Sequence, residues 1–231
     1  MALNDELVAR YSRQLLVPGF GEAVQERLLA ARVWVVNADA TAAAGLVALV
    51  QAGVGKLWVD DDELVGPGDR VGWLYGPGDV GKARVEAAIA ALSGLSRNTV
   101  VEKMPVGGVP TAAIVFASSI PQGIGAANVA RKAGVPHVVV EPDAEGGAVV
   151  AIPPGQPCFT CGRSVSGIGR PAQAGIAALA GFAATELLLM LAAPPQAVGR
   201  RIDLVRGVPH VRPTIRVSGC ACGEPGGAPA A

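Results

Sequence analysis

The residues best suited to chemistry in this chain are four cysteines. They form two close pairs, Cys158/Cys161 and Cys220/Cys222, in distant parts of a 231-residue sequence. Four thiolates in two short-spaced pairs suit a tetrahedral structural Zn²⁺, which would clamp an internal loop to the C-terminal region. The second pair is one residue tighter than the usual spacing, and reduced free thiols are the alternative. A redox role for Cys158 and Cys161 is disfavoured because no helix start is evident after Cys158.

A run of four acids occupies residues 60–63 and follows an apolar segment with the pattern of a buried strand. An acid at this point of a dinucleotide-binding unit commonly accepts a hydrogen bond from a ribose hydroxyl, and a pair of acids could bind Mg²⁺. A solvated loop at the end of a strand explains the same run equally well. Both interpretations stay open on spacing alone.

The segment before these acids has the outline of a nucleotide-binding β-α-β unit, but residues 37–42 are NADATA where a glycine-rich turn is expected. Glycines there permit positive φ and let backbone N–H groups approach phosphate oxygens. A carboxylate at Asp39 about 4 Å from a phosphate oxygen would repel it by about 4 kcal/mol at an effective dielectric of about 20, or about a thousandfold in affinity. The sequence instead favours Asp39 or Thr41 as a helix cap.

Two serines and two histidines complete the candidates for acid-base or nucleophilic chemistry. They are Ser118, Ser119, His137 and His210. Their spacing supports no catalytic triad, so ordinary structural roles are expected for all four.

The scaffold for these residues is predicted to be an α/β fold. Two amphipathic helices are expected in the first thirty residues, separated by the breakers of VPGFG. Strands are expected at residues 33–36, 56–60, 99–103, 112–117, 137–141 and 147–152, and helices at 41–52, 82–92, 125–133 and 172–193. This order predicts a right-handed crossover unit and a sheet that is mostly parallel at first. The glycine- and proline-rich loop between residues 64 and 82 is of a length that is more often functional, and no internal repeat is evident.

Composition restricts the partners. The 19 basic and 19 acidic residues cancel without a basic run, so nothing indicates binding to nucleic acid or to an anionic membrane. The N-terminus carries acids and arginines where a signal peptide would be apolar, which favours a cytoplasmic protein. Residues 172–193 approach the roughly 20 apolar residues that a bilayer requires, but Glu186 and the lack of basic anchors favour a buried core helix. A single domain over residues 1–223 and a disordered tail over 224–231 are expected.

Taken in order, several segments resemble the ThiF/MoeB/HesA family of adenylyltransferases, which is related to ubiquitin-activating enzymes. They are RYSRQLLVPGFGEAVQERLLAARVWVV, AGVGKLWVDDDELV, GKARVEAA, AGVPHVV, GQPCFTCGR and the final cysteine pair. The resemblance covers residues 8–223, and it implies a Rossmann-like, doubly wound and mostly parallel sheet of about eight strands, a homodimer and a bound zinc. It also implies a reaction in which ATP and Mg²⁺ adenylate the C-terminal glycine of a ubiquitin-like sulfur-carrier protein.

The resemblance assigns roles to individual residues. Arg13 matches the arginine that reaches across the dimer to the neighbouring nucleotide. Asp61 matches the ribose-binding acid, with Asp60 as a one-residue alternative. Near the family's Asn-x-x-Arg segment, Arg70 could supply the cation in a shifted register, while Asp69 stands in place of the asparagine.

The remaining assignments are departures from the family pattern. Arg84 replaces the usual final lysine of GKARV, and Lys82 is retained before it. Ser119 aligns with the family's magnesium-binding aspartate, and no cysteine between Cys161 and Cys220 could serve as a transfer thiol. With the lost glycine turn, these changes predict a degenerate relative, a pseudoenzyme that keeps the fold, the dimer and a protein-binding surface. An active adenylyltransferase is the alternative, and an NAD-dependent oxidoreductase is disfavoured because the same glycine losses damage a dinucleotide site.

Overall fold

An eight-stranded sheet organises the computed structural model, which describes residues 3–222 except 145, 164–172, 194–197 and 221. The strand order is β3-β2-β1-β4-β5-β6-β7-β8. The strands are β1 (Arg32–Val36), β2 (Lys56–Asp60), β3 (Val100–Lys103), β4 (Ala112–Phe116), β5 (His137–Asp143), β6 (Gly146–Ile152), β7 (Arg200–Val205) and β8 (Val208–Pro213). Neighbours from β3 to β5 pair in parallel, and neighbours from β5 to β8 pair antiparallel. The predicted α/β sheet, parallel in its first part, is confirmed.

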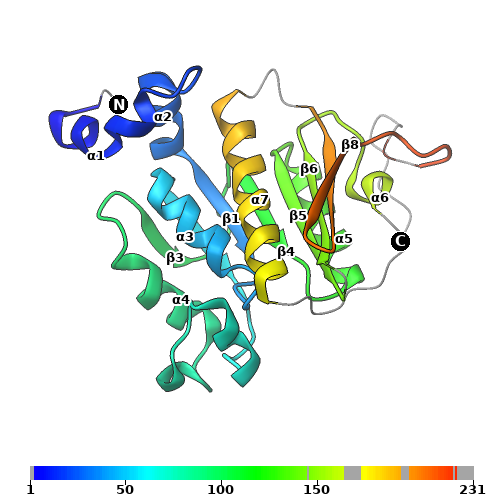
Figure 1. The fold of residues 1–231 in the computed structure, drawn as a ribbon, viewed down its shortest axis with the longest axis horizontal. Helices are drawn as coiled ribbons and strands as arrows, with labels where there is room; N and C mark the ends of the chain where they lie inside the picture. Colours follow the sequence, from blue (N-terminus) through cyan, green and yellow to red (C-terminus); the bar gives the residue numbers. More distant parts are fainter. Residues whose placement is uncertain (1–2, 145, 164–172, 194–197, 221, 223–231) are drawn as a thin grey trace.

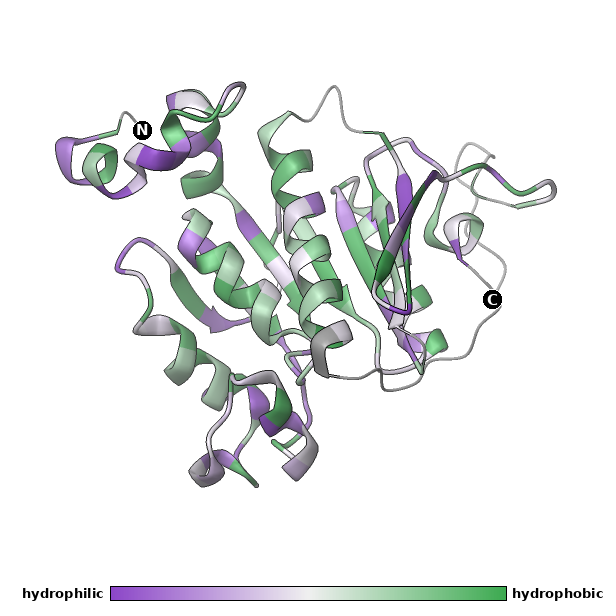
Figure 2. Cartoon of the chain, in the orientation of Figure 1, coloured by the Kyte–Doolittle hydropathy of each residue, from purple (hydrophilic) through white to green (hydrophobic). Residues whose placement is uncertain are grey.

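Helices cover both faces of this sheet (Figure 1). One face packs against α2 (Gly21–Ala30), α3 (Ala43–Ala52), α4 (Arg84–Ser93) and α7 (Gln173–Ala192), and the other against α5 (Ile120–Lys132) and the short α6 (Phe159–Gly162). The remaining helix, α1 (Asp5–Leu15), packs on α2. Figure 2 shows hydrophobic residues concentrated along the central strands and on α3 and α7, where the main core lies.

The apolar helix α7 is the segment that the sequence predicts to be a core helix. By length and composition alone it could cross a membrane, since Gly175–Ala192 has a mean hydropathy of 1.9. In the fold it packs on α3, β5 and β6, and both Leu179 and Leu187 are fully buried. Glu186 is only 6% exposed, and its carboxylate lies 2.6 Å from Nε of Arg200. The ion pair lets an acid remain inside this helix interface.

Helix α5 begins earlier than the sequence analysis expected. The sequence predicts it at residues 125–133, but it starts at Ile120. The bounds of the predicted strands, and of the other predicted helices after residue 32, agree with the structure within two residues. Ser119 is the N-cap, and its Oγ accepts the N–H of Gln122 at 3.3 Å. Pro121 suits the first turn because the N–H that it lacks would have no partner there. The signal was present in the sequence as Ser-x-x-Gln.

The long loop after β2 contains two copies of the same turn. The motif Gly-Pro-Gly-Asp occurs twice and forms two short 3₁₀ helices, η1 (Pro67–Gly72) and η2 (Pro77–Asp79). In each copy the aspartate side chain, Asp69 or Asp79, accepts the N–H of the glycine three residues earlier at 2.8 Å. This short repeat corrects the expectation that the chain has none.

His137, at the start of β5, is a buried neutral histidine. It is 2% exposed, its Nδ1 lies 3.0 Å from the carbonyl oxygen of Val135, and its Nε2 has no hydrogen-bond partner among the described residues. Burial lowers the pKa of His137 to about 4, against the bond to Val135 and with help from the charge of Arg131. The structural role expected for this residue agrees with its place in the core.

We expect His137 to make the protein less stable as the pH falls from about 6.5 to about 4. Between these pH values the unfolded chain binds a proton at this histidine and the native state does not. The free energy of unfolding is therefore highest above about pH 6.5 and falls by about 3 kcal/mol as the pH drops to about 4. Urea unfolding at about pH 7 and about pH 5 should show the loss in the wild type and much less of it in His137→Leu. The exposed His210→Leu should behave as the wild type, and an unchanged pH dependence in His137→Leu would contradict the assignment.

Candidate functional site

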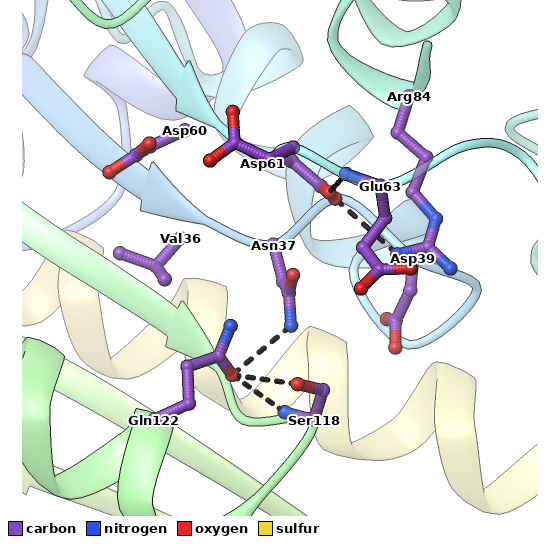
Figure 3. A pocket seen from close by; sticks show the side chains of 10 residues that line it. Val36, Asn37, Asp39, Asp60, Asp61, Glu63, Arg84, Ser118 and Gln122 are labelled. Carbon is purple, nitrogen blue, oxygen red and sulfur yellow. Dashed lines mark hydrogen bonds and ion pairs between the residues drawn. The ribbon is translucent and has the colours of Figure 1, made fainter. Parts of the chain in front are cut away.

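A pocket of about 380 Å³ lies at the carboxyl ends of β1 and β2. Sheets of this kind bind ligands where the strand order reverses, and here β2 and β4 lie on opposite sides of β1. Figure 3 shows its lining, which is Val36, Asn37, Asp39, Asp60, Asp61, Asp62, Glu63, Arg84, Ser118 and Gln122. These described residues include five carboxylates and one guanidinium, so the pocket is strongly acidic.

The turn after β1 uses its backbone N–H groups internally. Asn37 takes the positive φ, 64°, for which a glycine would otherwise be needed. Three of the following N–H groups donate to carboxylates of the same chain. The pairs are Ala38 with Asp61 at 2.8 Å, Thr41 with Asp39 at 2.8 Å and, more weakly, Ala40 with Asp69 at 3.4 Å. Carboxylates therefore stand where a phosphate-binding turn would offer its N–H groups to a ligand.

The prediction that Asp39 or Thr41 caps α3 is wrong. The N-cap position is Ala42, and no side chain caps this helix. Asp39 accepts the N–H of Thr41 with its side chain and the N–H of Ala42 with its carbonyl oxygen, at 3.0 Å, which forms an Asx turn before the helix. Burial raises the pKa of Asp39, while the N–H of Thr41 and the charge of Arg84 oppose the rise.

Arg84 joins the buried carboxylates beneath this turn. Its Nε and Nη2 both lie 3.0 Å from one oxygen of Asp69, and its Nη1 lies 3.7 Å from Asp61. The side chains of Asp61 and Asp69 are 0% and 4% exposed. Burial would lower the pKa of the Arg84 guanidinium, but the charges of Asp69 and Asp61 raise it instead. The Arg84 guanidinium is therefore paired with carboxylates of the same chain.

The loop after β2 closes over the same turn. An added Cβ on Gly72, the last residue of η1, would lie 2.4 Å from the carbonyl oxygen of Ala40, so the two backbones are in close contact. The hydroxyl of Tyr75 donates to the carbonyl oxygen of Ala38. Burial, aided by the nearby carboxylates, raises the pKa of Tyr75 well above its usual range, so this donor keeps its proton.

The N-terminal motif that contains Arg13 anchors α1 to the domain. Tyr11 is 3% exposed, and Nε2 of Gln14 donates to the carbonyl oxygen of Ala52 at the end of α3 at 3.1 Å. Arg13 itself is exposed, and its guanidinium makes no hydrogen bond or ion pair within the described part of the chain. Arg13 is not among the residues that line the pocket of its own chain.

Among the cations predicted to act in catalysis, Arg84 alone lines the pocket. Lys82 is exposed and pairs with Asp79 of η2 at 2.8 Å. Arg70 is exposed on η1 and does not border the pocket. The structure thus brings Arg84 together with the predicted acids and leaves the other two on the outer side of the loop.

The predicted ribose-binding acid, Asp61, is already fully engaged. Its side chain is 0% exposed, and its two carboxylate oxygens accept the N–H groups of Glu63 and Ala38, each at 2.8 Å. Its carboxylate is therefore not available to a ligand in this arrangement. The alternative, Asp60, is half-buried and bonds Nε1 of Trp34 at 3.0 Å with one oxygen, so it is the acid of this pair that a ligand could reach.

Ser119 lies outside the pocket lining, and its neighbour Ser118 borders the pocket in its place. Oε1 of Gln122 accepts the N–H of Ser118 at 2.9 Å and Nδ2 of Asn37 at 3.2 Å, as the dashed lines in Figure 3 show. Nδ2 of Asn37 also donates to the carbonyl oxygen of Phe116 at 2.9 Å. Asn37 and Gln122, which tie β1 to α5, were missed as site residues, although an asparagine in place of the first glycine was a signal.

The groups that could hold the phosphates of a nucleotide such as ATP are already bonded within the chain. The N–H groups and the guanidinium that would hold its phosphates are bonded to carboxylates, and the reachable part of the lining is acidic. A polyphosphate would meet repulsion without the cations that normally offset it. The lining suits a divalent or organic cation better than an anion.

The four predicted metal ligands converge. Their Sγ atoms all lie within 4.8 Å of one another. The closest pairs are Cys158 with Cys220 and Cys161 with Cys222, both at 3.6 Å, and Cys158 with Cys161 at 3.8 Å. Tetrahedral zinc with Zn–S bonds of about 2.3 Å separates its sulfurs by about 3.8 Å. The cluster therefore fits a zinc ion, and the tight spacing of the second pair does not prevent the geometry.

The local structure at Cys158 corrects one argument against a redox role. A helix does start after it: Cys158 is the N-cap of the four-residue α6, and its carbonyl oxygen accepts the N–H groups of Cys161 and Gly162 at 3.0 and 3.2 Å. However, burial raises the pKa of the Cys158 thiol and raises that of Cys161 to about 12. Against the effect of burial, hydrogen bonds to the other cysteines lower the pKa of Cys222 to about 7. Reactive redox thiols have lowered pKa values, and neither thiol of the Cys158/Cys161 pair has one, so a structural metal site stays the better interpretation.

Known proteins resemble this chain in sequence and in fold. The probable adenylyltransferase/sulfurtransferase MoeZ of Mycobacterium tuberculosis is 38% identical over 100 residues, which are 42% of this chain and 26% of MoeZ. The SAMP-activating enzyme E1 of Haloferax volcanii is 34% identical over 103 residues, 44% of this chain and 38% of that protein. The matched segment thus spans well under half the length of these relatives.

The fold similarity extends further than the sequence similarity. The crystal structure of E. coli MccB with MccA-N7isoASN superimposes with a TM-score of 0.79, covering 96% of this chain and 76% of that chain at 17% identity. At this identity the likeness concerns the fold. The profile of the ThiF family matches residues 11–119, which include the last part of α1, all of α2, β1 to β4 and most of the pocket lining. Over that segment, which is just under half of the chain, the sequence matches the ThiF family.

Proposed function

We propose that this protein is a ThiF-family adenylyltransferase homologue with a closed nucleotide site, acting as a protein-binding partner with little or no activity of its own. The observation that carries the proposal is the set of carboxylates on the turn after β1. Asp39, Asp61 and Asp69 take the N–H groups through which such a turn would bind phosphate. Adenylation also needs free cations as pyrophosphate leaves, and Arg84 is paired with Asp69.

Two departures from the family pattern support a coordinated change. Asp69 stands where the resemblance expects an asparagine, and Arg84 stands where it expects a lysine. These two residues are bonded to each other at 3.0 Å in the interior, with side chains 4% and 13% exposed. The Lys-to-Arg change keeps the positive charge and adds a planar fork of donors, and the Asn-to-Asp change adds the carboxylate that this fork binds. The pair supports a site rebuilt around an internal ion pair.

The proposed partners are a second copy of the chain and a small ubiquitin-like or sulfur-carrier protein. The relatives named above include an adenylyltransferase/sulfurtransferase and a SAMP-activating enzyme, and MccB was solved with MccA. Arg13 is exposed and unpaired within the described residues, which suits a role at a neighbouring protomer. A cytoplasmic location, a structural zinc on Cys158, Cys161, Cys220 and Cys222, and a single domain over residues 1–223 belong to the same proposal. The tail over 224–231 lies outside the described residues.

The second candidate is an active ATP-dependent adenylyltransferase. The pocket of about 380 Å³ at the switch of strand order favours it, as does Asp60, whose carboxylate a ribose could reach. MccB, which shares the fold, was also solved with ATP. In this candidate Asp39 and Asp69 would have to leave the turn when nucleotide binds.

Calorimetric titration with Mg-ATP should separate the two candidates. We expect no saturable binding to the wild type in the millimolar range, which corresponds to a binding free energy weaker than about −4 kcal/mol. The combined variant Asp39→Gly, Asp69→Asn and Arg84→Lys removes two of the three internal carboxylates and leaves Asp61, so it should gain measurable affinity. Asp79→Asn, the equivalent change in the second Gly-Pro-Gly-Asp turn, is the matched control and should gain none.

Exchange of labelled pyrophosphate into ATP, with a carrier protein that ends in Gly-Gly, tests turnover directly. The proposed function expects no exchange above background. Exchange by the unaltered protein that is lost in Arg13→Ala would refute it and establish the active enzyme, with Arg13 acting at the nucleotide.

A further inference from the structure

A second cavity, of about 240 Å³, lies beside the cysteine cluster and is lined by three arginines. Arg163 follows α6, Arg201 lies on β7 and Arg212 lies on β8, so three separate segments supply the guanidinium groups. The rest of its described lining is Cys161, Gly162, Pro213, Thr214 and Ile215, which includes no acid. No role at the nucleotide pocket accounts for this concentration of positive charge.

Two carboxylates hold the three arginines in place. Glu141 lies 2.6 Å from Nε of Arg163 and 3.5 Å from Nη1 of Arg201. Asp203 lies 2.6 Å from Nε of Arg201 and 3.1 Å from Nε of Arg212. The alternating chain of charges leaves one positive charge in excess. Within the described part of the protein, the terminal Nη groups of Arg163 and Arg212 make no hydrogen bond, so their donors stay available.

We propose that this cavity binds a small oxyanion, a phosphate or carboxylate group, through Arg163 and Arg212. Guanidinium groups held at Nε present their terminal N–H groups as a fork that matches two oxygens of such an anion. Arg201, with a side chain only 4% exposed, adds positive charge beside the cavity and holds Glu141 and Asp203 in place through ion pairs. A cationic or neutral ligand would leave the excess charge unbalanced. The volume suits an oxyanion with a short attached chain rather than a nucleotide.

The proposed oxyanion site adjoins the cysteine cluster but does not depend on the proposed function. Arg163 lies two residues after Cys161, which itself borders the cavity. Anion binding at this cavity is therefore independent of ATP binding at the pocket near β1, and the two can be tested separately. The test must be made on the full chain with its metal content measured, so that loss of the cysteine cluster is not mistaken for loss of the anion site.

Calorimetric titration with inorganic phosphate and, separately, with acetate at constant ionic strength tests the proposal. We expect one saturable site in the millimolar range for at least one of the two anions. A preference for phosphate or for acetate assigns the phosphate or the carboxylate group. Arg212→Gln should weaken binding by about tenfold, as expected when a charge-assisted hydrogen bond is lost.

Arg216→Gln is the matched control, because Arg216 is exposed on the same C-terminal segment, carries the same charge and does not border the cavity. It should bind both anions as the wild type does. Arg212 has a side chain 57% exposed, so its replacement should leave the fold intact, which circular dichroism and metal analysis check. No saturable binding of either anion, or equal losses in Arg212→Gln and Arg216→Gln, would overturn the proposal.

Discussion

Removal of the metal from the cysteine cluster is expected to lower the thermal unfolding midpoint by on the order of 10 °C. The cluster links Cys158 to Cys222 across the segment that contains α7, β7 and β8. Closing a loop of this length stabilises a fold by about 4 kcal/mol when treated as a crosslink. In a domain of this size each kcal/mol shifts the midpoint by roughly 2 to 4 °C. Cys158→Ser should give the same loss without a chelator.

Scanning calorimetry with metal analysis on each sample measures this effect. Thr160→Ala is the matched control, since Thr160 is exposed between the two cysteines and offers no ligand to the cluster. It should keep both the metal and the midpoint. A chelator-free preparation with much less than one equivalent of zinc, yet with the same midpoint as the loaded protein, would show that the thiols are free and structural zinc is the wrong assignment.

Replacing Arg84 with methionine is expected to cost about 3 to 5 kcal/mol of stability, the largest effect of a single change near the pocket. The methionine fills a similar volume but leaves Asp61 and Asp69 buried without their cation. Adding Asp69→Asn to this variant should restore part of the loss, because one of the uncompensated charges disappears. Urea unfolding of the two single variants and the double variant gives the coupling energy between the side chains.

The pair of Lys82 and Asp79 is a natural control for this cycle. Asp79 belongs to the second copy of the same turn. Nζ of Lys82 lies 2.8 Å from its carboxylate, a separation similar to that of Arg84 and Asp69, but the side chains of Lys82 and Asp79 are 55% and 30% exposed. The corresponding cycle, with Lys82→Met and Asp79→Asn, should give a coupling below about 1 kcal/mol because solvent screens the charges. Similar couplings for the two pairs would mean that Arg84 is not central to closing the turn.

Much of the scaffold could be predicted because it depends on local patterns. Short apolar runs such as those within residues 33–36 and 56–60 predict the strands, and the acids that follow Lys56–Asp60 fall at the ligand-binding edge of the sheet. The hairpin of β7 and β8 was not assigned by residue. Its signal was the turn at Arg206 and Gly207, both of which have positive φ, as a tight hairpin requires.

The bonding inside the candidate site could not be predicted, because it depends on the path of the loop after β2. Asp69 reaches the N–H of Ala40 across 29 positions, and only the fold of η1 brings them together. The sequence indicated that Asp39 conflicts with a phosphate, which agrees with its place in the pocket. It could not show that Asp61, assigned to a ribose, would be turned inward. A single chain specifies the residue types but not which of several acids meets which N–H group.

The outer strand β8 also limits how copies of this protein can join. Its neighbour Thr214 donates its N–H to the carbonyl oxygen of Gly199, so in this register the N–H groups of alternate residues along β8 point away from β7. Two of those outward positions are Pro209 and Pro213, which have no N–H to offer. An added strand would find a donor only at Val211. The sheet therefore resists edge-to-edge extension by an added strand along β8.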